Sequence, residues 1–140
     1  MKVSALVLLS VPFTLPLMSV SPYAPQGLER FKHRARHLVT SRLSHFNRFY
    51  GFAWKRVSIR DQKSRWGSCS SSGTLSFNWR LAVLPEPLAD YVIVHELCHL
   101  KHLDHSCAFW DLVARAIPDH HHHRRALRLI ERQFQYEQAP

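Results

Sequence analysis

The sequence predicts a small α+β domain, because stretches with helical spacing and stretches with strand-like alternation follow one another along the chain. Apolar side chains recur at helical spacing over residues 29–50. They alternate with polar ones over residues 55–62, and again over residues 75–79 after a Ser/Gly turn, which is typical of strands. A third observation is a helical run over residues 88–102 that contains no helix breaker. At 140 residues the chain has room for one compact domain.

The N-terminal part divides into an apolar segment and a linker. Residues 1–20 contain a lysine followed by an apolar run that resembles a signal peptide or a short anchor, although two prolines interrupt it. A buried strand, or a translation start at Met18, would explain the same residues. The Pro-rich residues 21–27 are typical of a linker. We therefore expect the folded domain to occupy residues 21–140.

The predicted first helix and the strands follow. Most arginines of residues 29–50 lie opposite the apolar stripe, and Gly51 is placed to end this helix. Two strands joined by a turn predict an antiparallel hairpin. The span between them, residues 63–73, is also long enough to form a structured loop. The second strand would present three large apolar side chains on one face, namely Leu75, Phe77 and Trp79.

Three helices are expected after the strands. Pro87 suits the first turn of the earliest one. Ser106 is placed to cap the next helix, and Pro118 is placed to end it. Asp119 is placed to cap a last helix that reaches about residue 136. Its first turn carries the histidines of residues 120–123, which we interpret as solvated.

Charge and cysteine content restrict the possible partners and compartments. Nineteen Lys and Arg against ten Asp and Glu give a formal charge of +9, which attracts nucleic acids, nucleotides, acidic proteins and anionic lipids. Three cysteines without a C-x-x-C pair argue against a disulfide framework and for a reducing compartment. We therefore favour a cytoplasmic protein, and expect membrane contact or export only if residues 1–20 are an anchor or a signal.

The chemistry is concentrated in the motif "HELCH", residues 95–99. On a helix, side chains four residues apart lie on one face, so His95 and His99 can bind one zinc ion. Glu96, next to the first histidine, can face a water molecule at the metal. The spacing therefore predicts a metal site in the helix at residues 88–102.

A catalytic zinc site needs a third protein ligand and keeps one position open for water. We expect His105 to be that ligand, which requires the chain to turn near residues 103–104. His102 competes for this role, but it lies about 60° further around the helix than His99. Cys98 and Cys107 are the other possible ligands, and we interpret both as buried free cysteines.

A zinc ion held in this way would acidify its bound water, and Glu96 would act as general base. A carboxylate or a carbonyl should orient each ligand imidazole, and Asp104 and Asp111 are candidates for that role. Arg65 either holds an anionic group of the substrate in the cleft or belongs to a turn fixed by the packing of Trp66.

Three further side chains have a structural interpretation. Asn78 is expected to pair either with backbone at the edge of the sheet or with the region of the active site, as buried polar groups require a partner; we favour the first, structural role. Phe109 and Trp110 recur with other apolar residues at helical spacing, so we expect them in the core.

Three stretches together resemble a known family. They are "RDQKSRWGSCSSSGTLSFNWRL", "YVIVHELCHLKHLDHSCAFW" and "PDHHHHRRAL". In combination they are similar to the YgjP-like zinc metallopeptidases, which are related to the SprT-like and WLM-type proteases. The resemblance implies one zinc ion on His95, His99 and His105, with Glu96 as catalytic base. It also implies a minimal zincin-like fold, in which a small antiparallel sheet packs on the metal-bearing helix.

The sequence departs from relatives in two places. The spacing of the histidines equals that of the metzincins, but His102 replaces their glycine and the downstream methionine turn is absent. Full-length YgjP-like relatives carry a further β-rich segment before the domain, where this chain has residues 1–20. The resemblance therefore implies that part of the usual sheet is missing.

These observations predict a zinc-dependent hydrolase, foremost a metallopeptidase acting on peptides or proteins. One alternative is hydrolysis of a nucleotide phosphoanhydride at the same metal, since a basic surface and Arg65 suit a triphosphate. Another is a basic nucleic-acid-binding module with structural zinc, in which Glu96 would have no role as a base. The physiological substrate and the oligomeric state are not specified by these patterns.

Overall fold

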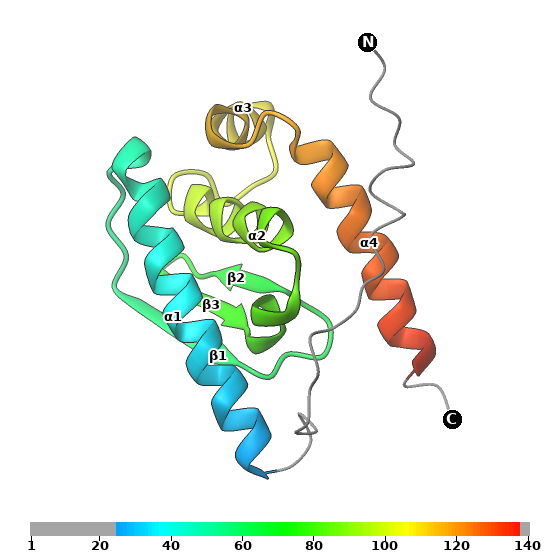
Figure 1. Cartoon of the computed structure of the whole chain (residues 1–140). Coiled ribbons are helices and arrows are strands. Elements are labelled where there is room, and N and C mark those ends of the chain that lie inside the picture. Colours follow the sequence, from blue (N-terminus) through cyan, green and yellow to red (C-terminus); the bar gives the residue numbers. More distant parts are fainter. Residues whose placement is uncertain (1–24, 138–140) are drawn as a thin grey trace.

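The computed structural model describes residues 25–137, which fold into four α-helices, one 3-10 helix and three strands (Figure 1). This confirms the predicted α+β class. The predicted apolar segment at residues 1–20 lies outside the described residues. The predicted linker at residues 21–27 is wrong in its last three residues, which already belong to the first helix.

The elements in chain order are α1 (Pro25–Tyr50), β1 (Arg56–Arg60), β2 (Gly67–Cys69), β3 (Thr74–Asn78), η2 (Trp79–Val83), α2 (Glu86–His99), α3 (Cys107–Ala116) and α4 (His120–Glu137).

Helix α1 packs one apolar stripe against the rest of the domain. The buried side chains of this stripe follow the helical repeat, at Phe31, Ala35, Val39, Leu43 and Phe46. The helix ends where predicted, because Gly51 adopts a φ of 67° and donates its N–H to the Asn47 carbonyl at 2.8 Å.

One arginine of α1 does not face solvent as the pattern suggested. Arg42 donates two hydrogen bonds to the Asp90 carboxylate, both at 2.7 Å. The two side chains are only 24% and 12% exposed, so this pair anchors α1 to α2 in a partly buried site.

The sheet is mixed, with the strand order β1-β3-β2. β1 pairs with β3 in parallel, and β2 pairs with β3 in antiparallel. The predicted antiparallel hairpin between β1 and β3 is therefore wrong. A parallel pair needs a connection of about a dozen residues, and residues 61–73 provide it. That span contains β2, whose three residues are too few to give a readable alternation.

β3 is the central strand and is buried along most of its length. Leu75 and Phe77 point into the core as predicted, but Trp79 begins η2 and is not part of the strand. The turn between β2 and β3 contains Gly73 at a φ of 87°, a backbone angle that favours glycine. This turn reverses the chain so that β2 lies at an edge of the sheet, beside α2.

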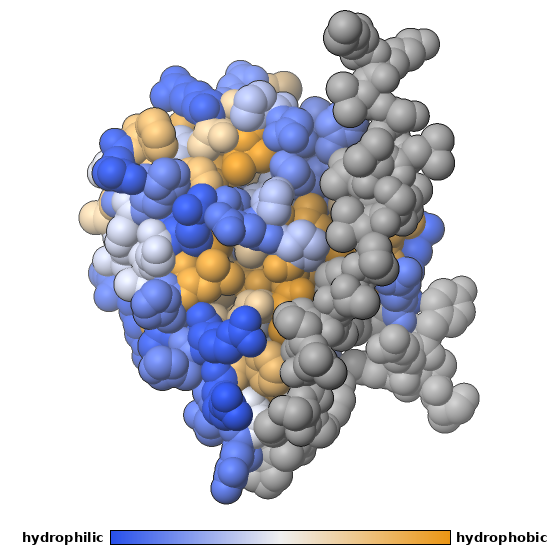
Figure 2. Space-filling model, in the orientation of Figure 1, coloured by the Kyte–Doolittle hydropathy of each residue, from blue (hydrophilic) through white to orange (hydrophobic). Residues whose placement is uncertain are grey.

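Helix α2 is the core of the domain. Figure 1 shows it at the centre, with the sheet on one side and α3 on the other, and it contacts α1, α3, α4 and β2. Eleven of its residues are buried, as expected for a helix surrounded by other elements. On the face shown in Figure 2, apolar residues gather in the middle, while polar residues cover the α1 side. The largest fully buried side chains around α2 include Phe77, Leu81, Ile93, Leu97, Phe109 and Val113.

The last two helices begin near the predicted caps. The Ser106 hydroxyl accepts the Phe109 N–H at 3.4 Å, which caps α3. α3 ends at Ala116, just before Pro118, and α4 starts after Asp119. The prediction of a fully solvated histidine tract is wrong for His120, which is buried. No helix in the described part of the chain combines the length and apolarity needed to cross a membrane.

Candidate metal centre and its cleft

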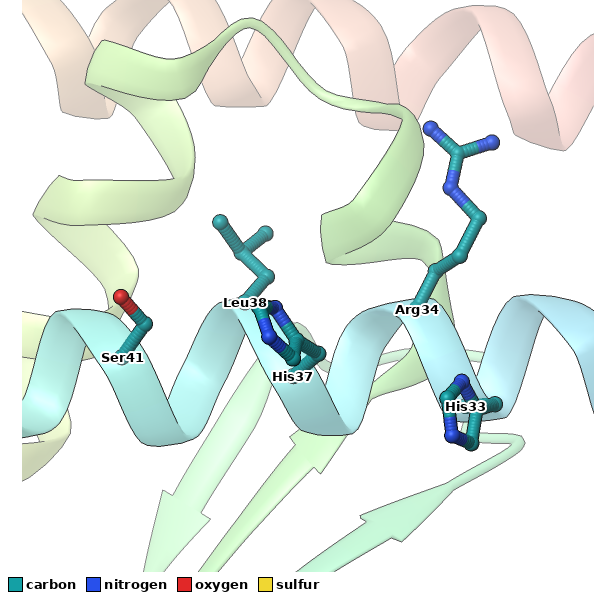
Figure 3. Close-up of a pocket in the computed structure, with 5 residues that line it drawn as sticks. All are labelled: His33, Arg34, His37, Leu38 and Ser41. Carbon is teal, nitrogen blue, oxygen red and sulfur yellow. The ribbon is translucent and has the colours of Figure 1, made fainter.

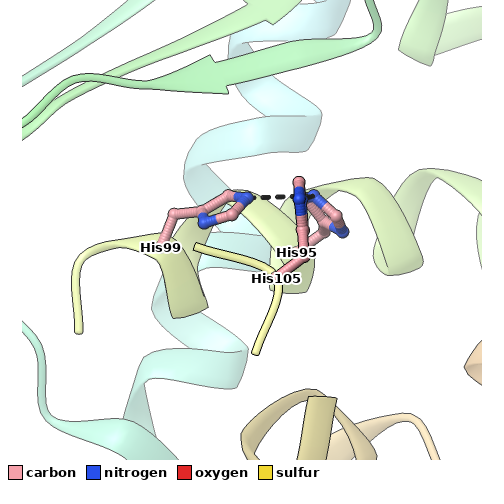
Figure 4. Close-up of side chains that lie close together, drawn as sticks. All are labelled: His95, His99 and His105. Carbon is pink, nitrogen blue, oxygen red and sulfur yellow. Dashed lines mark hydrogen bonds between the residues drawn. The ribbon is translucent and has the colours of Figure 1, made fainter. Parts of the chain in front are cut away.

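Three imidazoles converge at the C-terminal end of α2. His95 and His99 lie one helical turn apart, and their Nε2 atoms are 3.1 Å from each other. His105 returns from the loop after the helix and brings its Nε2 atom to 3.3 Å from that of His95. Figure 4 shows the three rings pointing toward one another, and one nitrogen of each lies within 4.8 Å of the others.

These spacings fit a tetrahedral metal ion. Ligand nitrogens about 2.0–2.1 Å from zinc in tetrahedral geometry lie about 3.3–3.4 Å apart. The two distances that involve His95 are close to this value. His99 is buried, His95 is half-buried and His105 is exposed, so the cluster is closed on one side and open on the other. The donor set could hold one metal ion and leave a position accessible to water.

The turn that returns His105 begins where α2 ends. The N–H groups of residues 100–102 donate to the carbonyls of Leu97 and Cys98, which tightens the last turn. His99 Nδ1 then lies 2.8 Å from the His102 carbonyl oxygen. A carbonyl only accepts, so Nδ1 carries the proton and the lone pair on Nε2 faces the cluster. His102 thus orients the His99 ring through its backbone carbonyl, and not through its side chain.

The groups that orient the imidazoles agree only in part with those predicted. For His99 the orienting group is a carbonyl, one of the two kinds expected, and it belongs to His102. For His95 it is the Tyr91 hydroxyl, 3.4 Å from Nδ1, in place of the candidate carboxylates Asp104 and Asp111. Tyr91 precedes His95 by four residues, so both lie on the same face of α2. That spacing is visible in the sequence and could have indicated this partner.

Two aromatic side chains of α3 hold the rings in place. Phe109 stacks on His99 with ring centroids 4.4 Å apart, and Trp110 stacks on His105 at 5.8 Å. The core position expected for Phe109 is confirmed, since it is fully buried. Packing of this kind restricts imidazole rotation and therefore favours a preformed site.

Burial disfavours the charged form of His95 and of His99. Burial lowers the pKa of His95 to about 3, and the neighbouring His99 and His105 add to this effect. Burial also lowers the pKa of His99. A metal binds only the neutral ring, so protons do not compete for these two side chains at neutral pH.

Glu96 is a buried carboxyl group next to the cluster. Glu96 is only 7% exposed. Burial raises the pKa of its carboxyl group to about 8, although the positive charge of Arg65 acts to lower this pKa. Gly67 of β2 lies directly against it. A Cβ atom at position 67 would be 2.8 Å from Glu96 Cγ and 3.2 Å from Oε1. Only glycine therefore leaves room for this carboxyl group.

Glu96 and His95 line a cleft of about 260 Å³. One wall is β2 with the loop before it, the floor is α2, and the other wall is α4. Arg65 also lines this cleft, as its interpretation as a substrate-binding residue requires, and it is exposed. Two further arginines, Arg124 and Arg128, line the cleft, and their four-residue spacing places them on one face of α4. The sequence allowed an anion-binding role for Arg124 with the histidine tract but did not connect it with this cleft, and it did not indicate Arg128.

Asn78 fixes the loop that carries Arg65. Its side-chain amide donates to the Gln62 carbonyl at 2.6 Å and to the Arg65 carbonyl at 2.8 Å. Its Oδ1 atom accepts the Arg80 N–H at 3.1 Å and so caps η2. The predicted backbone pairing of Asn78 is thereby confirmed, and it positions one wall of the cleft.

A second hollow lies on α1, outside the imidazole cluster. It measures about 310 Å³ and is lined by side chains of that single helix, namely His33, Arg34, His37, Leu38 and Ser41 (Figure 3). None of these belongs to the imidazole cluster, and none is buried. We therefore assign the candidate site to the cleft.

The cysteines lie apart from the imidazole cluster. Among the described residues, the only group with metal-site geometry consists of His95, His99 and His105. Cys98 is fully buried as predicted, with its thiol pKa raised to about 12 by burial. Cys107 is exposed, which contradicts the prediction that it is buried.

Comparison with known proteins agrees with this geometry. The chain is similar to the crystal structure of the metallopeptidase zymogen of Pyrococcus abyssi abylysin, with a TM-score of 0.53 and 31% identity. The similarity covers 57% of this chain and 80% of that one. A search of curated proteins found no significant match. The family model for the YgjP-like metallopeptidase domain matches residues 22–129, and the chain therefore belongs to the YgjP-like family.

Proposed function

We propose that this protein is a zinc-dependent metallopeptidase that uses one zinc ion and Glu96 as general base. The observation that carries this proposal is the buried carboxyl group of Glu96 beside three converging imidazoles, in one cleft. A purely structural metal site would have no use for a buried acid in such a cleft. Membership of a metallopeptidase family supports the same reaction class.

In this proposal His95, His99 and His105 hold the zinc ion. When bound, zinc would supply Lewis acidity to a water molecule and to the scissile carbonyl. Glu96 takes a proton from the water and delivers it to the nitrogen of the leaving amine. A general base works best with a pKa near the working pH, and burial raises the pKa of Glu96 to about 8.

Arg65 is the charged group of this cleft that we propose as a substrate-binding residue. Its guanidinium lies in the same cleft, and its segment is held by Asn78 through two hydrogen bonds. A planar guanidinium can bind a carboxylate, a phosphate or a developing oxyanion. Since phosphates are included, hydrolysis of a nucleoside triphosphate is the competing activity to test.

The decisive experiment compares the wild type with Glu96→Gln. Zinc content is measured by atomic absorption, and hydrolysis is followed with casein and with nucleoside triphosphates. We expect the variant to keep its zinc and to lose casein hydrolysis, because only the base is removed. Glu29→Gln, which changes an exposed carboxylate on α1, is the matched control and should leave both quantities unchanged.

Three outcomes would contradict the proposal. An unchanged rate in Glu96→Gln would mean that this carboxyl group is not the base. Hydrolysis of triphosphates without hydrolysis of casein would assign the site to nucleotides. Stoichiometric zinc with neither activity, together with salt-sensitive binding to DNA, would favour a nucleic-acid-binding module with structural zinc.

A further inference from the structure

The cleft beside Glu96 is lined by three arginines from two opposite walls. Arg65 comes from the loop before β2, and Arg124 and Arg128 come from α4, one helical turn apart. All three side chains are exposed, so they are accessible to a bound molecule. His95 and Glu96 form part of the floor between them.

The three arginines of this cleft are not held in ion pairs by any residue that the structure describes. Within the described part of the chain, no carboxylate forms an ion pair with any of the three arginines. Two acidic residues also line the cleft, and neither forms an ion pair with these arginines. Glu96 is buried, and Glu131 accepts a hydrogen bond from the Trp66 indole N–H at 2.8 Å.

One of the three arginines is held in place by a neighbouring ring. The Arg124 guanidinium lies 5.2 Å from the ring centroid of Trp110, which restricts its position.

We propose that the arginine cleft binds a carboxylate of the substrate, so that the protein selects acidic peptides. A guanidinium binds a carboxylate through two parallel hydrogen bonds, and opposed arginines can engage it from both walls. The inference rests on the proposed peptidase function, since the cleft contains Glu96. The carboxylate could belong to an Asp or Glu side chain near the scissile bond, or to the C-terminus of a short peptide.

Three quenched-fluorescent peptides of one neutral sequence distinguish these sources. The first has an amidated C-terminus, the second has one Asp near the scissile bond and an amidated C-terminus, and the third has a free C-terminus. The zinc-loaded full chain should cleave the second or the third with a KM about tenfold below that of the first, as expected for one charged hydrogen bond. The peptide that benefits identifies the carboxylate.

Substitutions in α4 test whether Arg124 and Arg128 bind the carboxylate. Arg128→Gln should raise the KM of the preferred peptide about tenfold and leave kcat unchanged, because the contact is made equally in ground and transition states. Arg128→Lys retains the charge and should recover part of this loss. Arg124→Gln should act like Arg128→Gln. Arg125→Gln, an exposed arginine of the same helix outside the cleft, is the matched control and should have no effect.

Binding separates this inference from the proposed function. Fluorescence anisotropy with zinc-loaded Glu96→Gln needs no turnover, and the acidic peptide should bind about tenfold more tightly than the neutral one. If casein is cleaved but the three peptides bind and react equally, the carboxylate site is wrong and the peptidase stands. If acidic peptides bind through Arg128 but no peptide is cleaved, the peptidase is wrong and the carboxylate site stands. Equal binding in Arg128→Gln and the wild type would overturn the inference.

Discussion

Glu96→Gln should change how the stability of the metal-free protein depends on pH. The carboxyl group of Glu96 is almost completely buried, and burial raises its pKa from 4.5 to about 8. Glutamine has nearly the same shape as the protonated acid and carries no charge at any pH. The variant therefore shows the stability of the fold without the cost of a buried carboxylate.

The sign and the size of the effect follow from proton linkage. Between pH 4.5 and about 8 the unfolded chain releases the Glu96 proton, while the folded chain retains it. The folded state binds more protons, so the wild type loses stability relative to the variant as the pH rises. The interval of 8 minus 4.5, at about 1.4 kcal/mol per pH unit, gives a total on the order of 5 kcal/mol. About 3 kcal/mol of this is reached by pH 7.

Urea unfolding in the presence of a chelator measures this difference. Wild type and Glu96→Gln are compared at pH 5, 6, 7 and 8, and the difference in free energy of unfolding is plotted against pH. The titration of His95 is common to both proteins and cancels in the difference. A difference that stays constant over this range, or that narrows as the pH rises, would refute the assignment of a buried, proton-retaining acid at position 96.

Four further substitutions have defined outcomes. Gly67→Ala places a methyl group against Glu96, so it should cost about 1–3 kcal/mol in urea unfolding and abolish hydrolysis with zinc content retained; full activity would contradict this. In zinc competition titrations, His105→Ala should lower the affinity for zinc by about 100-fold or more. Loss of a residue that only hydrogen-bonds to a metal ligand already lowers metal affinity by about 10–100-fold. His102→Ala keeps the backbone carbonyl and should change little, and the reverse order would exclude our ligand set. Ser106→Ala removes the cap of α3 and should cost about 1 kcal/mol of stability, and an unchanged urea midpoint would disprove the capping role.

The pairing of His95 with His99 could be predicted from the sequence because it depends on helical geometry alone. The spacing of His95 and His99 specifies one face of α2, and this holds wherever the helix lies. The return of His105 was expected from the need for a third ligand. The structure brings its Nε2 atom close to His95 as that expectation required.

The features of the fold and of the site that could not be predicted from the sequence depend on contacts between distant segments of the chain. The parallel pairing of β1 and β3 results from insertion of the short β2, which has no periodicity of its own. The arginines of α4 become part of the site only because that helix packs beside α2. The same holds for Trp66 and Glu131, which are 65 residues apart and joined by one hydrogen bond.

The compact sequence span of the imidazole cluster has a consequence for folding. All three rings lie within residues 95–105, so bringing them together closes only a short loop and costs little chain entropy. Partly unfolded chains that retain the end of α2 would therefore still bind a metal ion. Because such binding also stabilises the denatured ensemble, added zinc should raise the unfolding temperature by less than its affinity for the native protein implies.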